Sequence, residues 1–510
     1  MGANTIEPAR HTAAQSMTGR ELSPQVTEAL TERDLLVVSN RQPYAHTYEN
    51  GEITVSRPAG GLTAGLDPVM QRTEGTWIAW GDGDADFEVG DDGIVEVPPD
   101  DPSYHLSRVE LSEGDIDGYY YGYSNQALWP LCHGMVYPAR CDSRDFERYR
   151  AVNQRFGEAV LEQAEGDSLI WFQDYHFALT PRIVRDELSN ALLTQFWHIP
   201  WPAPSVFRVC PQAESILRGL LANDLLVFHI PEYVENFLDC IKKELPQAGI
   251  NREQRTVTYD GATTTIRAFG LGIDAERTEE LASASGVWPD LAKRYGIEDQ
   301  TVAVGVDRLD YTKGIPERID AIERFFEENT EWRGEFTYVQ NGSASRSEIE
   351  SYEYLQQRVD TAIERLNDRF STEGWQPVVR VDEMLTEKEL YALYHHSDLA
   401  LVSALCDGMN LVAKEYVASQ IENDGVLVLS SFAGAHEELG EHAVSINPYD
   451  TQAFAEAIER ALLLPEEERH ERMTVQRERV QEYDLFRWMD DVLDSLLACE
   501  SECDGSPTHV

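Results

Sequence analysis

The stretch "TVAVGVDRLDYTKGIPER", residues 301–318, decides how the second half of this chain folds. It begins as a short apolar run, passes through charged residues and continues past Gly314 as an amphipathic segment. A short run rich in Val and Leu followed by a helical pattern is typical of a buried parallel strand in a βαβ unit. Arg308 and Lys313 therefore lie where the predicted strand ends.

Similar apolar runs alternate with amphipathic segments along the whole chain. They are "DLLVVSN", "DSLIWFQDYH", "LLTQFWHIP", "DLLVFHI", "EFTYVQNGS", "PVVRVDE", "DLALVSAL" and "GVLVLSSF". A β-rich and Gly-rich stretch at 245–270 divides them into two series, and 510 residues exceed what one core usually holds. We therefore expect an α/β protein with two doubly wound, Rossmann-like domains. Ligands of such sheets bind beyond the carboxyl ends of the strands, so the two domains should face each other across a deep cleft.

Composition shifts give the expected domain boundaries. Both ends are polar and lack a sustained apolar period, whereas the segment before the tail has a helical period. The predicted parts are a flexible N-terminal extension at 1–30, a first Rossmann-like domain at 31–271, a second at 272–465, a helical segment at 466–498 and a tail at 499–510.

The charge balance excludes some partners. Asp and Glu number 91 against 42 Lys and Arg, for a formal net charge of −49, and the acidic residues are scattered along the chain. Such a surface repels nucleic acid and anionic membranes, whose binding needs clustered basic residues.

The sequence holds six lysines. Lysine depletion with an acidic surface indicates a protein that works in concentrated salt, so we expect a halophile's cytoplasmic protein.

Apart from Cys499 and Cys503 in the polar tail, the seven cysteines lack paired or zinc-like spacing, which indicates reduced thiols and no metal site. No run of 18 apolar residues occurs, and the first residues lack a hydrophobic signal core, so no membrane partner is expected. Oligomeric state is left open, with a homo-oligomer as one alternative.

Arg308 and Lys313 are the first candidates for chemistry. Two fixed cations without a carboxylate cluster can neutralise a diphosphate in a site that holds no metal. A compact ammonium aimed at a diphosphate is not readily exchanged for another group, which would explain a lysine retained in this chain. Asp307 and Asp310 lie beside the pair and are expected to orient it. An internal ion-pair cluster of these four residues is the alternative.

Polar residues also follow the predicted strands of the first domain. Arg41, at the end of "VVSNR", is a candidate phosphate ligand, and Gly61 of "AGGL" opens a helix whose N–H groups favour an anion, unless the glycines only form a turn. Asp174 leaves an apolar strand in "WFQDYH", which favours a role in binding a ligand hydroxyl. His198 of "FWHIPWP" is either a second ligand contact or a core histidine.

Three further stretches supply candidate residues for a ligand that contains a sugar. In "YYYGYSNQALWP", residues 119–130, interior packing explains most of the aromatic residues, but Tyr120 and Trp129 could also cover a sugar face. "SASRSEIE" supplies Arg346. "CDGMNLVAKE" joins Asp407 to a helix start, with Glu415 one turn into that helix, where a carboxylate can accept ribose hydroxyls.

These motifs, taken together, resemble the trehalose-6-phosphate synthase family of retaining, metal-independent glycosyltransferases. The resemblance covers residues 34–495 and rests on motifs in the family's order: "VVSNR", "AGGL", "YSNQALWP", "DYH", "DRLDYTKGIPER", "DGMNLVAKEY" and "GVLVLSSFAGA". It implies a GT-B type fold with a C-terminal helix that packs back on the first domain. It also implies transfer of glucose from a nucleotide sugar to position 1 of glucose 6-phosphate, without a metal or other cofactor.

The resemblance implies a role for each candidate residue. The acceptor would be bound by Arg41, Tyr120, Trp129, Asp174 and Arg346. The donor would be bound by Gly61, His198, Arg308, Lys313, Asp407, Gly408, Met409, Asn410, Leu411 and Glu415. The residues implied in catalysis are Asp174, His198, Arg308, Lys313 and Asp407.

The implied mechanism has no covalent enzyme nucleophile, because the leaving diphosphate takes the proton of the incoming hydroxyl on the same face of the sugar. UDP-glucose is the expected donor, with GDP-glucose and ADP-glucose open. One alternative is a glucosylglycerol-phosphate synthase that uses glycerol 3-phosphate. Another is a non-catalytic paralogue that senses sugar phosphate, but such a protein is expected to lack Arg308, Lys313 or Asp407, and all three are present.

Overall fold

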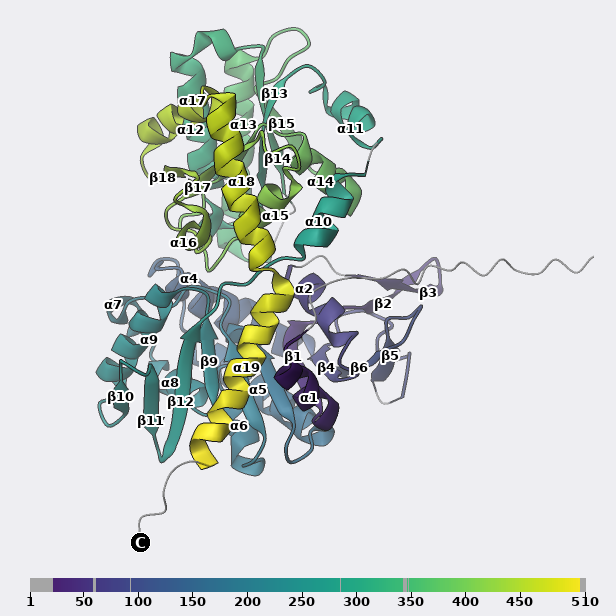
Figure 1. Cartoon of the computed structure of the whole chain (residues 1–510), viewed down its shortest axis with the longest axis vertical. Helices are drawn as coiled ribbons and strands as arrows, with labels where there is room; N and C mark the ends of the chain where they lie inside the picture. The colour runs from purple at the N-terminus through teal and green to yellow at the C-terminus, as the bar shows by residue number, and fades with distance from the viewer. Residues whose placement is uncertain are drawn as a thin grey trace, which may run out of the picture.

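A computed structural model describes residues 22–57, 61–91, 93–284, 286–342, 346 and 348–504, without the side chains of 61–64 and 501–504. The chain forms two α/β domains that lie one above the other (Figure 1). The first domain ends near Phe269 and the second begins at helix α10, Ala275–Ala282. The expected boundary at 271–273 therefore falls on the connection between the domains.

A largely parallel sheet forms the first domain. Within the described residues it has ten strands in the order β10-β11-β12-β9-β8-β7-β1-β4-β6-β5, with β10, β11 and β5 antiparallel at the edges. The strands are β1 Leu35–Arg41, β4 Thr76–Trp80, β5 Ile94–Val97, β6 Tyr104–Val109, β7 Leu169–Gln173, β8 Leu192–Phe196, β9 Leu225–Phe228, β10 Gly249–Asn251, β11 Thr256–Tyr259 and β12 Ala262–Ala268. A separate hairpin pairs β2 Ala45–Glu49 with β3 Glu52–Ser56.

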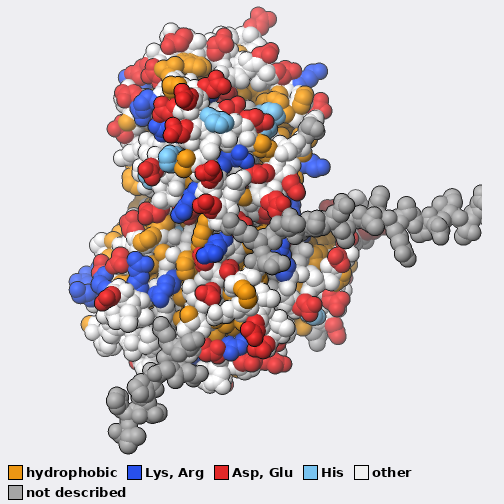
Figure 2. Space-filling view, in the orientation of Figure 1, with side chains coloured by type: hydrophobic (Ala, Val, Ile, Leu, Met, Phe, Trp, Pro, Cys, Tyr) orange, Lys and Arg blue, Asp and Glu red, His pale blue; other side chains and the backbone are white. Residues whose placement is uncertain are grey.

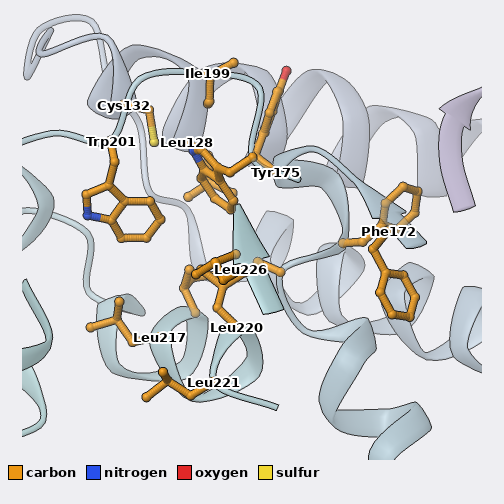
Figure 3. Close-up of a cluster of buried hydrophobic side chains, with 14 of the residues drawn as sticks. Leu128, Cys132, Phe172, Tyr175, Ile199, Trp201, Leu217, Leu220, Leu221 and Leu226 are labelled. Carbon is orange, nitrogen blue, oxygen red and sulfur yellow. The ribbon is translucent and has the colours of Figure 1, made fainter. Parts of the chain in front are cut away.

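Helices cover both faces of this sheet, which is why its strands are continuous apolar runs. The helical elements are α1 Pro24–Glu32, α2 Gly61–Met70, α3 Glu113–Asp115, η1 Ile116–Leu128, α4 Trp129–Cys132, α5 Ser143–Gln163, η2 Tyr175–Phe177, α6 Thr180–Glu187, α7 Pro204–Phe207, α8 Ala213–Leu220 and α9 Pro231–Glu244. Alternate residues of β1 face two separate cores, Leu36 and Val38 one of them, Leu35 and Val37 the other. Figure 3 shows part of the first core, in which Tyr175 lies near Ile199 and Leu128, and which also contains Trp201 and leucines of α8 and β9.

In the second domain the described residues form a six-stranded parallel sheet in the order β15-β14-β13-β16-β17-β18. The strands are β13 Thr301–Val306, β14 Phe336–Asn341, β15 Val378–Val381, β16 Leu399–Val402, β17 Val426–Ser430 and β18 Val444–Ile446. The helical elements after α10 are α11 Trp288–Tyr295, η3 Tyr311–Lys313, α12 Ile315–Glu328, η4 Thr330–Trp332, α13 Glu350–Phe370, α14 Glu387–His395, α15 Leu411–Ser419, α16 His436–Leu439, α17 Thr451–Leu462, α18 Glu466–Glu482 and α19 Leu485–Asp504.

Each sheet has a topological switch point, where two neighbouring parallel strands lead to helices on opposite faces. In the first sheet it lies between β1 and β7, and in the second between β13 and β16. Arg41 ends β1 and Asp174 follows β7, while Arg308 follows β13 and Asp407 follows β16. The prediction of two doubly wound sheets is confirmed, and each switch point carries a pair of the predicted site residues.

The C-terminal segment differs from the expected single unit at 466–498. Helix α18 packs on α15, α16 and α10 of the second domain, and only α19 returns to the first domain, where it contacts β8 and β9 (Figure 1). The division lies at 483–484, where Leu485 N donates to Ile273 O at 3.0 Å. Trp488 of α19 is buried against Trp171, with ring centroids 5.2 Å apart.

The expected flexible ends also differ from the structure. Residues 24–30 belong to helix α1, whose N-cap Ser23 accepts from Val26 N and whose first turn begins with Pro24. Ser23 N donates to Asp490 Oδ1 at 2.8 Å, so α1 packs against α19. Helix α19 itself continues to Asp504, beyond the predicted tail boundary at 499. Tertiary contact between the two ends orders segments whose local sequence is polar. Residues 1–21 and 505–510 lie outside the described residues.

Acidic side chains spread over the visible face of both domains (Figure 2). Because the formal charge of −49 makes like charges repel, we expect the melting temperature to rise when KCl is raised from about 0.1 M to about 1 M, where the Debye length falls from about 10 Å to about 3 Å. Thermal unfolding followed by circular dichroism measures the shift. Equal melting temperatures at both salt concentrations would contradict the expectation of salt adaptation.

In the part of the chain that the structure describes, no helix combines the length and the apolar composition needed to cross a bilayer.

Candidate active site

Lys313 and Asp407 form an ion pair at the switch point of the second sheet. Lys313 ends the short helix η3, which Asp310 caps by accepting from Thr312 N at 3.0 Å. Lys313 Nζ donates to Asp407 Oδ2 at 2.5 Å, and the side chains of Lys313 and Asp407 are both largely buried. Burial raises the pKa of Asp407, but the Lys313 ammonium together with the Asn410 amide outweighs burial and lowers that pKa below its usual range.

Arg308 belongs to the same loop after β13 and is exposed. No hydrogen bond or ion pair joins it to any other residue described, and its guanidinium lies 5.7 Å from the centroid of the Trp129 ring. The structure contradicts the alternative of an internal ion-pair cluster, since neither Asp307 nor Asp310 pairs with Arg308 or Lys313 among the described residues, although Asp310 caps the helix that Lys313 ends. Asp307 pairs with Arg318 at 2.7 Å and Asp310 with Arg346 at 3.3 Å, because both carboxylates point into the domain, where those guanidinium groups are buried.

The start of helix α15 is held by Asn410. Its φ of 82° is left-handed, its Oδ1 caps the helix by accepting from Ala413 N at 3.1 Å, and its Nδ2 donates to Asp407 Oδ2 at 3.0 Å. Gly408 touches the first domain, since a Cβ there would lie 2.1 Å from His198 O. The helix N-terminus, the acidic residue before it and the first domain therefore meet at one point.

The remaining donor candidates lie on the same helix or at a helix start. Met409 O accepts from Ala435 N at 2.7 Å, and Leu411 is the first residue of α15. Glu415 lies one turn further, where Tyr394 OH donates to it at 3.4 Å and burial raises the pKa of Glu415 to about 7. Gly61 opens α2 as predicted, but residues 58–60 before it lie outside the described residues.

Arg346 of the second domain packs on Trp129 of the first. Its guanidinium lies 4.2 Å from the Trp129 ring centroid, and its Nη1 donates to Tyr352 OH at 2.6 Å and to Asp310 Oδ2 at 3.3 Å. The side chain is 6% exposed, and its Nε has no partner among the described residues. A buried guanidinium with a free N–H at a domain boundary suits an anionic ligand.

A π-helix carries the aromatic candidates. Element η1 is a π-helix across Ile116–Leu128, and Trp129 N donates to Ser124 O, five residues earlier. π-Helical segments are rare and occur mostly at functional sites. Tyr120 stacks on His176, with ring centroids 6.1 Å apart and planes at 14°. The sequence predicted the aromatic cluster but gave no sign of this backbone geometry.

Arg41 reaches the same cluster from the end of β1. Its Nη1 donates to Asp82 Oδ2 at 2.6 Å and its Nη2 to Tyr120 OH at 3.2 Å. Burial raises the pKa of Tyr120, but the nearby guanidinium groups of Arg346 and Arg41 outweigh it and bring that pKa below its ordinary value. Two arginines from different domains thus converge on one phenol.

Asp174 has a strained backbone, with φ 70° and ψ −179°, in a region that side chains other than glycine rarely adopt. Its Oδ1 accepts from Tyr175 N at 2.9 Å and from His198 N at 3.1 Å. Burial nevertheless raises the pKa of Asp174 to about 7. A strained backbone and a buried carboxylate both lower the stability of the fold. Their presence at one residue indicates a role in binding a ligand.

The pKa of Asp174 predicts how stability depends on pH. The folded value of about 7 exceeds the unfolded value of about 3.9, so the folded state holds the proton more tightly and Asp174 costs stability as pH rises from about 4 to about 7. We expect Asp174→Asn to raise the melting temperature most above pH 7 and to give no gain near pH 4. Thermal unfolding at several pH values measures this.

Asp167→Asn, at an exposed position before the same strand, serves as the control and should leave the melting temperature nearly unchanged at every pH. A gain for Asp174→Asn of equal size at pH 5 and pH 8 would contradict the prediction.

His198 lies in the first domain, half-buried, with its backbone carbonyl against Gly408. Its Nε2 lies 2.8 Å from Gln173 Oε1, and since that oxygen only accepts, Nε2 carries the proton of the neutral ring. Burial, followed by the nearby His229, lowers the pKa of His198 well below its usual value. The ring is thus a neutral group held at a fixed angle.

Sequence reasoning assigned no role to His176, although "WFQDYH" contains it. His176 is 8% exposed and stacks on Tyr120, and neither ring nitrogen has a partner among the described residues. Burial lowers its pKa well below the usual value. The only available signal was its place at the end of β7, which applies to any residue after a parallel strand.

A cavity of about 220 Å³ lies between the two domains. Residues of both domains line it: Asn125, Gln126, Pro130, Pro138, Arg140, Tyr311, Glu348, Ile349, Glu350 and Ser351. Over the described ranges, no group of three or more His, Cys, Asp or Glu side chains is placed to hold a metal ion.

Two facing Rossmann-like domains with paired residues at both switch points define a glycosyltransferase of the GT-B type. The chain belongs to glycosyltransferase family 20, whose model matches residues 33–498. An α,α-trehalose-phosphate synthase [UDP-forming] from Candida albicans is 33% identical over 475 residues, which cover 92% of this chain and 98% of that relative.

Solved structures show the same relation. The UDP-forming α,α-trehalose-phosphate synthase from Burkholderia xenovorans in complex with glucose-6-phosphate has a TM-score of 0.82 and 30% identity, over 91% of this chain and 100% of that chain. An E. coli structure bound with UDP-2-fluoro glucose also has a TM-score of 0.82, with 31% identity, over 91% of this chain and 98% of that chain.

Proposed function

We propose that this enzyme transfers glucose from UDP-glucose to glucose 6-phosphate and forms α,α-trehalose 6-phosphate with retention. The observation that carries the proposal is the convergence at one domain boundary of the Lys313 and Asp407 pair, the buried Arg346, and Arg308, which pairs with no other described residue. The relatives support the choice of substrates, since one is named UDP-forming and a similar structure holds glucose-6-phosphate.

The acceptor would lie on the first-domain side. Arg346 and Arg41 both approach Tyr120 OH and can neutralise a phosphate dianion there. Trp129 offers an indole face to the sugar. Asp174 Oδ1 already accepts two backbone hydrogen bonds, whereas Oδ2 accepts none from the described residues, so Oδ2 would accept a hydrogen bond from a hydroxyl of the acceptor.

The donor would lie on the second-domain side. Arg308 and Lys313 would hold the diphosphate, and the N-terminus of α15 with its backbone from Gly408 to Leu411 would add N–H donors and the positive end of the helix dipole. Glu415, one turn into the helix, would accept hydrogen bonds from the ribose hydroxyls. His198 and Asp407 would position the glucose between the domains, and the backbone at Gly61 would approach the diphosphate.

In the proposed mechanism the enzyme supplies no covalent nucleophile. Arg308 and Lys313 stabilise the charge that develops on the leaving diphosphate, and one diphosphate oxygen takes the proton of the acceptor hydroxyl. Attack and departure on the same face of glucose give retention. Positioning and charge stabilisation therefore account for the catalysis, and no metal enters any step.

A product assay tests the proposal. UDP-, GDP- and ADP-glucose are crossed with glucose 6-phosphate and glycerol 3-phosphate in about 1 M KCl, with and without EDTA. We expect α,α-trehalose 6-phosphate from UDP-glucose and glucose 6-phosphate, at equal rates in both arms. Product from glycerol 3-phosphate alone would replace the acceptor with a polyol phosphate. No product from any combination would indicate a sensing protein.

A further inference from the structure

Ser403 joins the two loops that carry the candidate donor residues. It follows β16 and is fully buried. Its Oγ lies 3.0 Å from both Lys313 O and Gly314 O, and it accepts from Arg318 Nε at 2.9 Å. A hydroxyl has one proton. Because Arg318 occupies an acceptor position of Oγ, that proton must be directed to the two carbonyl oxygens.

Arg318 is fixed by its own contacts. Its side chain is fully buried, its Nη2 donates to Asp307 Oδ2 at 2.7 Å and its Nη1 to Tyr338 OH at 2.8 Å. Gly305 of β13 leaves room for it, since a Cβ there would lie 2.1 Å from Nη1. A buried guanidinium with these partners has a single arrangement, so it holds the Ser403 hydroxyl in one orientation.

The turn at Lys313 is pressed against the loop after β16. Gly314 has φ 63°, and a Cβ there would lie 2.2 Å from Ser403 O. Leu405 N donates to Thr312 O at 2.7 Å. With the Lys313 and Asp407 pair, the loops after β13 and β16 are thus joined by backbone, hydroxyl and charged contacts.

We propose that Ser403 is a positioning residue for Lys313. Its hydroxyl fixes the carbonyls of residues 313 and 314, and through them the place from which the Lys313 ammonium reaches the diphosphate. This role rests on the proposed function. Small displacements of a catalytic group cost up to about 100-fold in rate, so loss of the hydroxyl should affect turnover more than acceptor binding.

The test compares three variants of the full chain. We expect Ser403→Ala to lower kcat by about 10- to 100-fold with the KM for glucose 6-phosphate unchanged. Ser403→Cys keeps a side chain of similar size with a weaker hydrogen-bond donor, so it should lower kcat less than Ser403→Ala does. It also provides a second measurement if Ser403→Ala does not fold. The matched control is Ser397→Ala, which removes a buried hydroxyl that donates to Leu393 O at 2.5 Å before the other end of β16. It should keep kcat near that of the wild type.

A double-mutant cycle separates positioning from structure. If Ser403 acts through Lys313, Ser403→Ala should cost no further activity in a Lys313→Ala background. An equal loss in both backgrounds, or kcat values for Ser403→Ala and Ser403→Cys that match Ser397→Ala, would overturn the inference. Wild-type activity of Lys313→Ala alone would instead reject the proposed diphosphate clamp.

Discussion

Replacing Lys313 by alanine is expected to lower kcat by about 10²- to 10³-fold while the fold is retained. The ammonium is the proposed partner of charge that grows on the leaving diphosphate, and such contacts act mainly in the transition state. The substitution also leaves the largely buried Asp407 without its cation, which adds to the loss. Initial rates with saturating UDP-glucose and glucose 6-phosphate measure the effect, with circular dichroism as the test of folding.

Two companion variants sharpen this result. Lys388→Ala removes an exposed lysine of α14 and should leave the rate unchanged. Lys313→Arg keeps the charge but replaces a compact ammonium by a larger planar group, so partial activity is expected. Near wild-type turnover of Lys313→Ala would contradict the assignment of the clamp.

Arg346→Ala is expected to raise the KM for glucose 6-phosphate by about 100-fold with little change in the KM for UDP-glucose. Hydrogen bonds to charged groups contribute about 1.5–3 kcal/mol each, and a guanidinium can make two to one phosphate. The expected selectivity follows from the position of Arg346, which packs on Trp129 and approaches Tyr120 at the acceptor side. Steady-state kinetics with each substrate varied in turn measure both constants.

Arg358→Ala is the control for this experiment, because Arg358 lies on α13 of the same domain, is half-exposed and sits 3.8 Å from Glu317. It should change neither KM. Equal increases in the KM values of both substrates for Arg346→Ala would indicate that Arg346 supports the domain interface and not the acceptor phosphate.

The strand ends were predictable because their signal is local. The apolar runs before Arg41, Asp174, Arg308 and Asp407 are long enough for a strand, and a parallel strand places the residue after it at the ligand edge of the sheet. The helix start at Leu411 was equally visible. The π-helix at 116–128 was not, because its hydrogen bonds differ from those of an α-helix by one residue and leave no distinct periodicity.

The ionic partner of Lys313 was not found from the sequence. Asp307 and Asp310 are adjacent in sequence to the two cations, yet Lys313 pairs with Asp407, 94 residues away. The reason is strand order, since β16 lies next to β13 in the sheet and brings its loop against η3. Residues that are close along the chain are not necessarily the ones that meet across neighbouring strands of a parallel sheet.

The sequence by itself determined the two-domain α/β class, the ends of the strands and the residue types at those ends, because these follow from local apolar runs and breaks. Only the tertiary structure decided which residues act together: Arg346 on Trp129, Gly408 against His198, and Ser403 beneath Lys313. Those pairs depend on strand order and on the docking of two domains, which involve contacts between residues far apart in the chain.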